Sequence, residues 1–274
     1  MSVLKPEDYT EPCCCFATGA KPDAAPTAQS IPVPDIVREL DGLLEHGDIE
    51  GGRKLLERAL NTARDMGDWR GELSIQSELM GLHRRTGDKA AALSAVEAGL
   101  AIIGSRWLSR TVSGATVTLN AATTLKAFGQ AKASLPLFDE VLRVYSETLD
   151  PRDYRFAGLY NNMALSCADV CEFEKAEALF RRAMAVISAL PSPENELAVT
   201  LCNLAELYER RDPEDERIAG CMEKAWDNLN APGLPRDGYH AFTASKCAPT
   251  FAHFGYFIYD MELRRRAKEI YEGT

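Results

Sequence analysis

The chain has 274 residues, of which 46% are hydrophobic and 26% charged, a composition typical of a folded globular protein. Its formal net charge of -10 argues against a general nucleic-acid binder, because phosphate contacts need a basic face. No run of about 18 apolar residues and no secretory signal is present, so the sequence predicts neither a membrane span nor export, and we expect a cytoplasmic protein with free thiols.

Residues 1–32 contain five prolines and little hydrophobic periodicity, which predicts an extended tail. The run Cys13-Cys14-Cys15 lacks the CxxC pairs of a zinc site, and no lipidation signal accompanies it. We interpret these cysteines as incidental thiols. A second interpretation stays open, in which the segment from Lys5 to Phe16 occupies a binding groove of its own or of a neighbouring chain.

From residue 33 onward the hydrophobic pattern is helical, and each stretch predicts two helices joined by a short turn. The predicted pairs are 35–45 with 50–64, 73–84 with 89–103, 114–127 with 132–148, 154–168 with 174–190, and 194–209 with 215–229. Gly47, Gly87 and Gly129 are predicted to end helices in the left-handed conformation. The dipeptides Asp150-Pro151 and Ser192-Pro193 predict helix starts with proline as the first helical residue.

A break rich in proline and glycine separates the segment 231–274 from the rest. This segment predicts a last helix pair, 239–259 with 261–272, which is either a further repeat or a cap.

Several positions recur at a nearly fixed step over residues 33–230. Two of the recurring sets are Leu56, Val96, Phe138, Phe180 and Met222, and Leu40, Met80, Ala122, Ala164 and Ala205, with steps of 40 to 42 residues. A single period kept over five units indicates stacked structural repeats. Small residues such as Ala164, Ala176 and Ala205 are expected where two helices cross closely, and the large residues are expected to fill the space between units.

The segments 160–165, 172–183 and 201–208 resemble tetratricopeptide repeats, and the step of about 42 residues resembles the long kinesin-light-chain type. HEAT repeats have a similar length, but the Gly-Asp turns and the small-residue positions favour the tetratricopeptide type. The third unit departs from the pattern at Ser134 and Val141, where alanine is usual. The resemblance implies an all-α fold: a right-handed superhelical α-solenoid of antiparallel helix pairs, with a concave groove lined by the first helix of each pair.

The resemblance also implies a recognition position on the groove-facing helices, which in this family is often asparagine. The residues at this position are Glu78, Asn120, Asn162 and Asn203. An amide offers a donor and an acceptor to the backbone of an extended peptide, although the same amides could instead bridge neighbouring helices. Basic residues one turn along could clamp a ligand carboxylate or be ordinary surface charge; they are Arg84, Arg85, Lys126 and Arg210.

The remaining candidates for chemistry predict no catalytic centre. Four cysteines at periodic helix positions, Cys167, Cys171, Cys202 and Cys221, are predicted to be small core residues. The four histidines form no HExxH or triad spacing, and no phosphate loop is present, so we expect no enzyme activity, no cofactor and no metal.

The sequence therefore predicts a non-enzymatic scaffold that binds an unidentified protein or peptide in its concave groove, without nucleic acid or membrane as a partner. The alternative is a structural module that self-associates as a homo-oligomer, its groove filled by its own or a neighbour's N-terminal tail.

Overall fold

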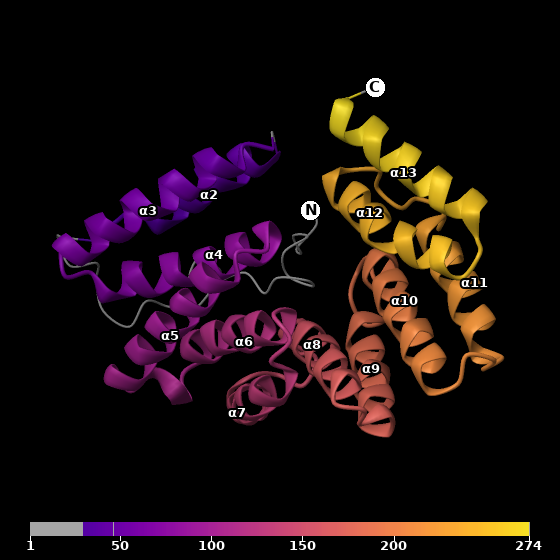
Figure 1. Cartoon of the computed structure of the whole chain (residues 1–274), viewed down its shortest axis with the longest axis horizontal. Helices are drawn as coiled ribbons and strands as arrows, with labels where there is room; N and C mark the ends of the chain where they lie inside the picture. Colours follow the sequence, from indigo (N-terminus) through magenta and orange to yellow (C-terminus); the bar gives the residue numbers. More distant parts are fainter. Residues whose placement is uncertain (1–29, 46, 274) are drawn as a thin grey trace. The chain divides into compact units, whose positions relative to one another are not determined.

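The computed structural model describes residues 30–45 and 47–273. All regular structure within these ranges is helical, which confirms the all-α prediction (Figure 1). The α-helices are α2 (Val33–Glu45), α3 (Ile49–Asp65), α4 (Trp69–Thr86), α5 (Lys89–Ser105), α6 (Val112–Ala127), α7 (Ala131–Thr148), α8 (Arg155–Asp169), α9 (Phe173–Ile187), α10 (Glu194–Arg211), α11 (Arg217–Leu229), α12 (Gly238–His253) and α13 (Phe257–Glu272). A short 3-10 helix, η1 (Leu108–Arg110), lies between α5 and α6.

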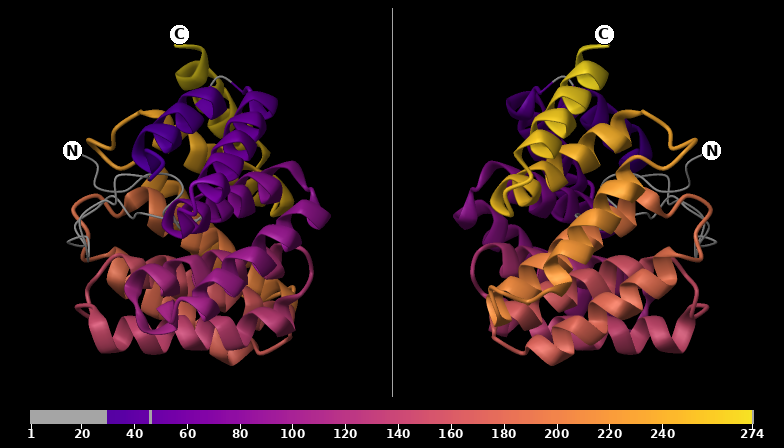
Figure 2. Two further views of the ribbon diagram at one scale, coloured as in Figure 1. Left: turned by 90° about the vertical axis from the view of Figure 1, so that its left-hand side faces the viewer. Right: turned by 90° about the vertical axis from the view of Figure 1, so that its right-hand side faces the viewer.

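Consecutive helices pack as pairs, beginning with α2 and α3 and ending with α12 and α13. Contacts divide the described helices into two compact units at Thr148 and Leu149, with α2–α7 in the first unit and α8–α13 in the second. Successive pairs also touch through their first helices, α4 with α6 in the first unit and α10 with α12 in the second. Figures 1 and 2 both show α13 lying along α12. Each unit is thus a stack of helix pairs.

The turns within the first three pairs have the predicted glycine geometry. Gly47, Gly87 and Gly129 have φ values of 73°, 73° and 79°, in the left-handed region that glycine adopts without steric cost. In the first two pairs an aspartate directly follows the glycine. Asp48 and Asp88 accept hydrogen bonds from backbone N–H groups three residues on, which caps α3 and α5. The Gly-Asp dipeptide therefore ends one helix and starts the next.

The fourth pair makes this turn without glycine, and one cysteine prediction is wrong as a result. Cys171 has φ 64° and is exposed in the turn between α8 and α9. The helical pattern had placed it in the core, but the residue lies just beyond the end of α8. Cys167, Cys202 and Cys221 are buried, as predicted.

The cores contain the small and large residues expected from the repeat pattern. Ala164, Ala176 and Ala205 are fully buried, which permits close approach of the two helices in a pair. Phe138, Phe180 and Met222 are also fully buried and supply the larger volume. Close packing of small and large side chains therefore holds each pair together.

The helices predicted from residues 154 and 194 begin at Arg155 and Glu194, but neither has the proline that the two dipeptides predict as its first helical residue. Asp150 accepts from the Arg152 N–H at 2.8 Å, and Asp153 accepts from the Arg155 N–H at 3.0 Å. These two aspartate turns delay α8 to Arg155, so the proline after Asp150 lies before the helix. Similarly, α10 begins after Pro193, which takes the capping position itself and receives no side-chain cap.

The break inside the last pair also differs from the prediction. Helix α12 ends at His253, and Gly255 reverses the chain with φ 83°. The Tyr256 N–H donates to the Phe251 carbonyl at 2.8 Å, which closes the turn. The sequence predicts this break near residue 260, because aromatic residues on both sides of Gly255 continue the helical pattern past the true end of α12.

Part of the predicted tail belongs to the first core. Ile31 is buried, and its N–H donates to the Asp68 carboxylate at 3.0 Å. The run from Cys13 to Cys15 and the segment from Lys5 to Phe16 lie outside the described residues. Within the described ranges, no helix combines the length and the apolar character needed to cross a membrane.

Candidate binding faces on the first helices

In the first unit, the predicted recognition residue Asn120 bridges two first helices. Its Nδ2 donates to Ser77 Oγ on α4 at 2.6 Å, and both residues are buried. Farther along the same seam, Arg84 Nη1 donates to Thr124 Oγ1 at 2.6 Å and to the Asn120 carbonyl at 3.4 Å. The helices α4 and α6 are therefore joined by a polar seam, as the helix-bridging interpretation of the amides expects.

The side-chain oxygen of Asn120 takes no part in this bridge. Asn120 Oδ1 is buried and has no hydrogen-bond partner among the described residues. A buried acceptor without a partner costs roughly 1–3 kcal/mol. Ser77 fixes the orientation of the amide, so Asn120 keeps an oriented acceptor that is not satisfied within the unit.

In the second unit, Asn203 on α10 repeats this arrangement with a different partner. Its Nδ2 donates to Asn161 Oδ1 on α8 at 3.1 Å. Asn203 Oδ1 has no hydrogen-bond partner among the residues that the structure describes, and Asn203 is half-buried. The neighbouring Asn162 instead donates to the Gly158 carbonyl of its own helix at 3.0 Å. The structure thus gives the three predicted asparagines three different hydrogen bonds.

The predicted charged residues also differ in their surroundings. Arg210 is exposed and spans two helices, donating to Asp169 at 3.1 Å and to the Ala168 carbonyl at 2.8 Å. Arg85 is exposed at the end of α4, whereas Glu78 and Lys126 are half-buried. Arg210 thus acts as a helix-end clamp on α8, because its guanidinium covers a carbonyl of the last turn.

A second polar seam joins α10 to α12. Thr250 donates to Glu206 Oε1 at 2.7 Å, and the ring of His253 lies 2.8 Å from the Glu209 carboxylate. Both pairs lie toward the C-terminal ends of the two helices. They hold the half-buried carboxylates of α10 in defined positions beside Asn203.

The opposite end of this seam contains a fully buried histidine. His240 Nδ1 lies 3.2 Å from Asn195 Oδ1, and Nε2 lies 3.1 Å from an Arg236 nitrogen. Because arginine only donates, Nε2 must accept and Nδ1 must carry the proton. Burial, with help from the nearby Arg236 and Arg266, lowers the pKa of His240 to about 4. The imidazole is therefore neutral and acts as a fixed hydrogen-bonding group.

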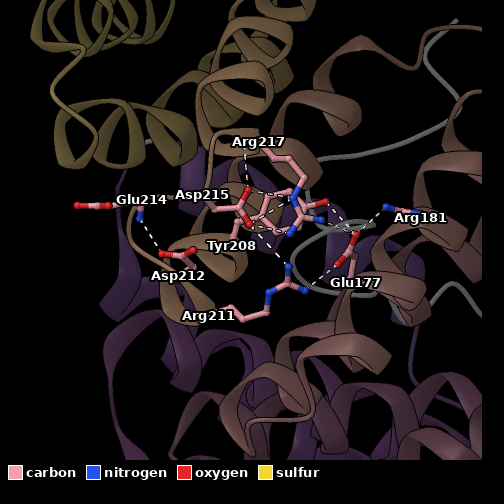
Figure 3. Close-up of polar contacts among 8 residues, drawn as sticks. All are labelled: Glu177, Arg181, Tyr208, Arg211, Asp212, Glu214, Asp215 and Arg217. Carbon is pink, nitrogen blue, oxygen red and sulfur yellow. Dashed lines mark hydrogen bonds and ion pairs between the residues drawn. The ribbon is translucent and has the colours of Figure 1, made fainter.

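On its other side, α10 is anchored by a charged network centred on Glu177 (Figure 3). This carboxylate on α9 accepts from Arg181 at 2.6 Å, from the Tyr208 hydroxyl at 3.1 Å and from Arg217 at 3.2 Å. The Arg217 guanidinium also lies 3.9 Å from the centre of the Tyr208 ring. Three helices, α9, α10 and α11, therefore meet at one carboxylate.

Asp215 completes this network in the turn before α11. It accepts from the side chain of Arg217 at 2.6 Å and from its N–H at 3.0 Å. These hydrogen bonds lower the pKa of Asp215 to about 2. The network fixes the α10–α11 turn and so sets the position of α10, which carries Asn203.

The hydrogen-bond partners of these first-helix side chains were not predicted from the sequence. The missed residues are Ser77, Thr124, Asn161, Asp169, Thr250 and His253. A signal was present, because each lies 40 to 44 residues from its partner. Within the described residues no group of three histidine, cysteine or acidic side chains is placed to hold a metal ion.

Comparison with known proteins agrees with this arrangement. The model of the tetratricopeptide repeat family matches residues 155–218, which run from α8 into α11. Residues 155–218 are thus similar to tetratricopeptide repeats. The crystal structure of BtubC (BKLC) from P. vanneervenii has the same fold, with a TM-score of 0.62 and 22% sequence identity over 73% of this chain and 80% of that chain.

A second similar structure is a putative kinesin light chain of P. anserina with nearly identical TPR-like repeats. It gives a TM-score of 0.50 and 17% identity over 71% of this chain and 92% of that chain. Among curated protein sequences no significant match was found. These likenesses establish a tetratricopeptide-like helical repeat fold, and such repeats generally serve as protein-interaction scaffolds.

Proposed function

We propose that this tetratricopeptide repeat chain is a non-enzymatic scaffold that binds an extended peptide segment along its first helices. One observation carries the proposal. The half-buried Asn203 of α10 is held by a hydrogen bond from its Nδ2 to Asn161, while its Oδ1 has no partner among the described residues. A peptide N–H is the complementary donor for such an oxygen.

The rigidity of the seams supports this proposal. Asn161 holds the Asn203 amide before any ligand arrives, so little side-chain entropy remains to be lost on binding. Glu206 and Arg210 lie on the same helix as Asn203 and add charges of both signs. A peptide with mixed polar side chains fits this surface better than a wholly apolar one.

The test begins with peptides selected from a random library on the purified chain, followed by affinity measurements with variants. We expect Asn203→Ala to weaken binding by about tenfold, the equivalent of one hydrogen bond. The matched control is Asn228→Ala, because Asn228 donates only to the Lys224 carbonyl of its own helix at 2.7 Å. Equal affinity for the wild type and both folded variants would assign Asn203 to structure alone.

The cysteines support a reducing compartment in the same proposal. Five cysteines are free thiols in the described residues, and the nearby Cys247 thiol, together with burial, raises the pKa of Cys202. Two adjacent thiols are prone to form a disulfide in an oxidising compartment. We therefore assign the protein to the cytoplasm.

A second candidate function, self-association, is favoured by one feature of the last helix. Phe257, Ile258 and Met261 on α13 are 65%, 79% and 70% exposed. Such a group of exposed apolar side chains often marks a contact surface. The two candidates differ in whether the mass of the purified protein rises with its concentration.

A further inference from the structure

An exposed tryptophan interrupts the connection between α5 and η1. Trp107 is 88% exposed, and its backbone lies in the left-handed region with φ 57° and ψ 33°. This conformation is sterically disfavoured for a residue with a Cβ. The Trp107 ring is exposed to solvent, so no burial of the ring compensates for this steric cost.

The residues after Trp107 fix this conformation. The Leu108 carbonyl accepts from the Thr111 N–H at 2.9 Å and from its hydroxyl at 2.8 Å. Gly114 approaches the same carbonyl so closely that a Cβ there would stand 2.2 Å from the oxygen. The Leu108 side chain packs against the first core. The backbone therefore holds the Trp107 ring outward.

Arg106 connects Trp107 to a second group of cationic and aromatic side chains. The guanidinium carbons of Arg70 and Arg106 lie 4.3 and 5.3 Å from the centre of the Trp69 ring. Arg106 directly precedes Trp107, and Arg110 is the exposed last residue of η1, three residues after it. We call Trp69, Arg70, Arg106, Trp107 and Arg110 the Trp107 patch.

The charges of the Trp107 patch are not neutralised within the described part of the chain. Its three arginines form no ion pair there, whereas most other arginines do. The carboxylates next to it in sequence have other partners: Asp68 accepts from the N–H groups of Ile31 and Gly71, and Glu72 pairs with Arg64 at 2.7 Å. Three arginines without an ion-pair partner among the described residues thus accompany the exposed Trp107 ring in a chain of net charge -10.

We propose that the Trp107 patch is a docking site for a short acidic segment of a partner protein. The carboxylates of that segment pair with the three arginines, and one of its apolar side chains covers the Trp107 ring. Tryptophan and arginine are the side chains that most often dominate binding energy at protein interfaces. Charge complementarity of this kind also speeds association.

The charge balance favours a peptide over a nucleic acid. Arginines beside aromatic rings also suit single-stranded nucleic acid. However, a nucleic acid carries one negative charge per phosphate, and the acidic remainder of this chain would repel it. A short acidic segment brings its few charges only to the patch.

The test measures fluorescence anisotropy of a fluorescein-labelled peptide of Asp and Glu with a single Leu, titrated with the full chain. The variant Arg70/Arg106/Arg110→Glu is expected to bind at least about tenfold more weakly than the control Arg58/Arg152/Arg182→Glu. The control changes three exposed arginines elsewhere and has the same net charge. Equal weakening in both variants, absence of peptide binding to the wild type, or binding of oligo-dT in place of the peptide overturns the proposal.

A second variant separates binding from folding. Trp107→Gly removes the ring and places glycine at a positive φ that glycine favours, so the melting temperature should stay equal or rise. Peptide affinity should fall by about tenfold. A lower melting temperature would make Trp107 a structural residue, and unchanged affinity would exclude its ring from the site. Either result overturns the proposal.

Discussion

At the scale of single residues, two side chains keep positive φ angles, and they do so in different surroundings. Trp107 is held by neighbouring hydrogen bonds and projects its ring into solvent, whereas Cys171 occupies an ordinary helix-ending turn. The preceding pair has Gly129 in the same turn with φ 79°. Cys171 thus bears a steric cost at a position where the repeat otherwise uses glycine.

Replacement of this cysteine should stabilise the protein. Cys171→Gly is expected to raise the free energy of unfolding by about 1 kcal/mol, because glycine adopts the left-handed conformation without a Cβ clash. Urea unfolding measures the change. The control is Cys171→Ala, which keeps a Cβ and should leave stability unchanged. An equal gain in the free energy of unfolding in both variants would show that loss of the thiol, and not relief of backbone strain, causes the stabilisation.

At the scale of helices, the Glu177 network decides how α10 is held. Glu177 has a side-chain exposure of 13% and accepts from groups on α10 and α11 as well as from its own helix. Removing the charge leaves only a neutral amide oxygen to accept from Tyr208 and Arg217 and removes the ion pair with Arg217. The geometry therefore makes the junction of α9, α10 and α11 depend on one carboxylate.

The corresponding prediction is that Glu177→Gln destabilises the protein by about 1–2 kcal/mol, a range that allows for the partial exposure of the arginines. Chemical unfolding followed by circular dichroism measures this loss. Glu174→Gln on the same helix is the matched control, because Glu174 is exposed, and its stability should equal that of the wild type. Equal stability of the two variants would show that the network contributes nothing net.

The same scale explains what the sequence could predict and what it could not. The helix pairs could be predicted from glycines at fixed steps and from small residues such as Ala164 and Ala176, because turns and helix crossings depend on local conformation and packing volume. The hydrogen-bond partners depend on how each helix is rotated about its axis, which a repeat period does not specify. Asn203 therefore pairs with Asn161, although the recurring recognition position aligns it with Asn162.

At the scale of the whole molecule, the last helix carries an apolar surface that the earlier second helices lack. Leu263 of α13 is buried, as Phe180 of α9 is, so the two helices can be aligned on these residues. In this alignment Phe257, Ile258 and Met261 of α13 correspond to Glu174, Lys175 and Ala178 of α9. The repeat pattern thus does not account for these apolar side chains. In helical repeat proteins an outer surface in contact with water is usually polar.

We therefore predict that two copies of the chain associate through α13. The wild type should increase in mass with concentration in sedimentation equilibrium, because association removes these apolar side chains from water. Ile258→Glu/Met261→Glu should stay monomeric, since each glutamate would lose its hydration in the contact. Lys268→Glu, exposed on the same helix and equal in net charge to the double variant, should associate like the wild type. A wild type that is monomeric at every concentration contradicts self-association and leaves the peptide scaffold as the function to test.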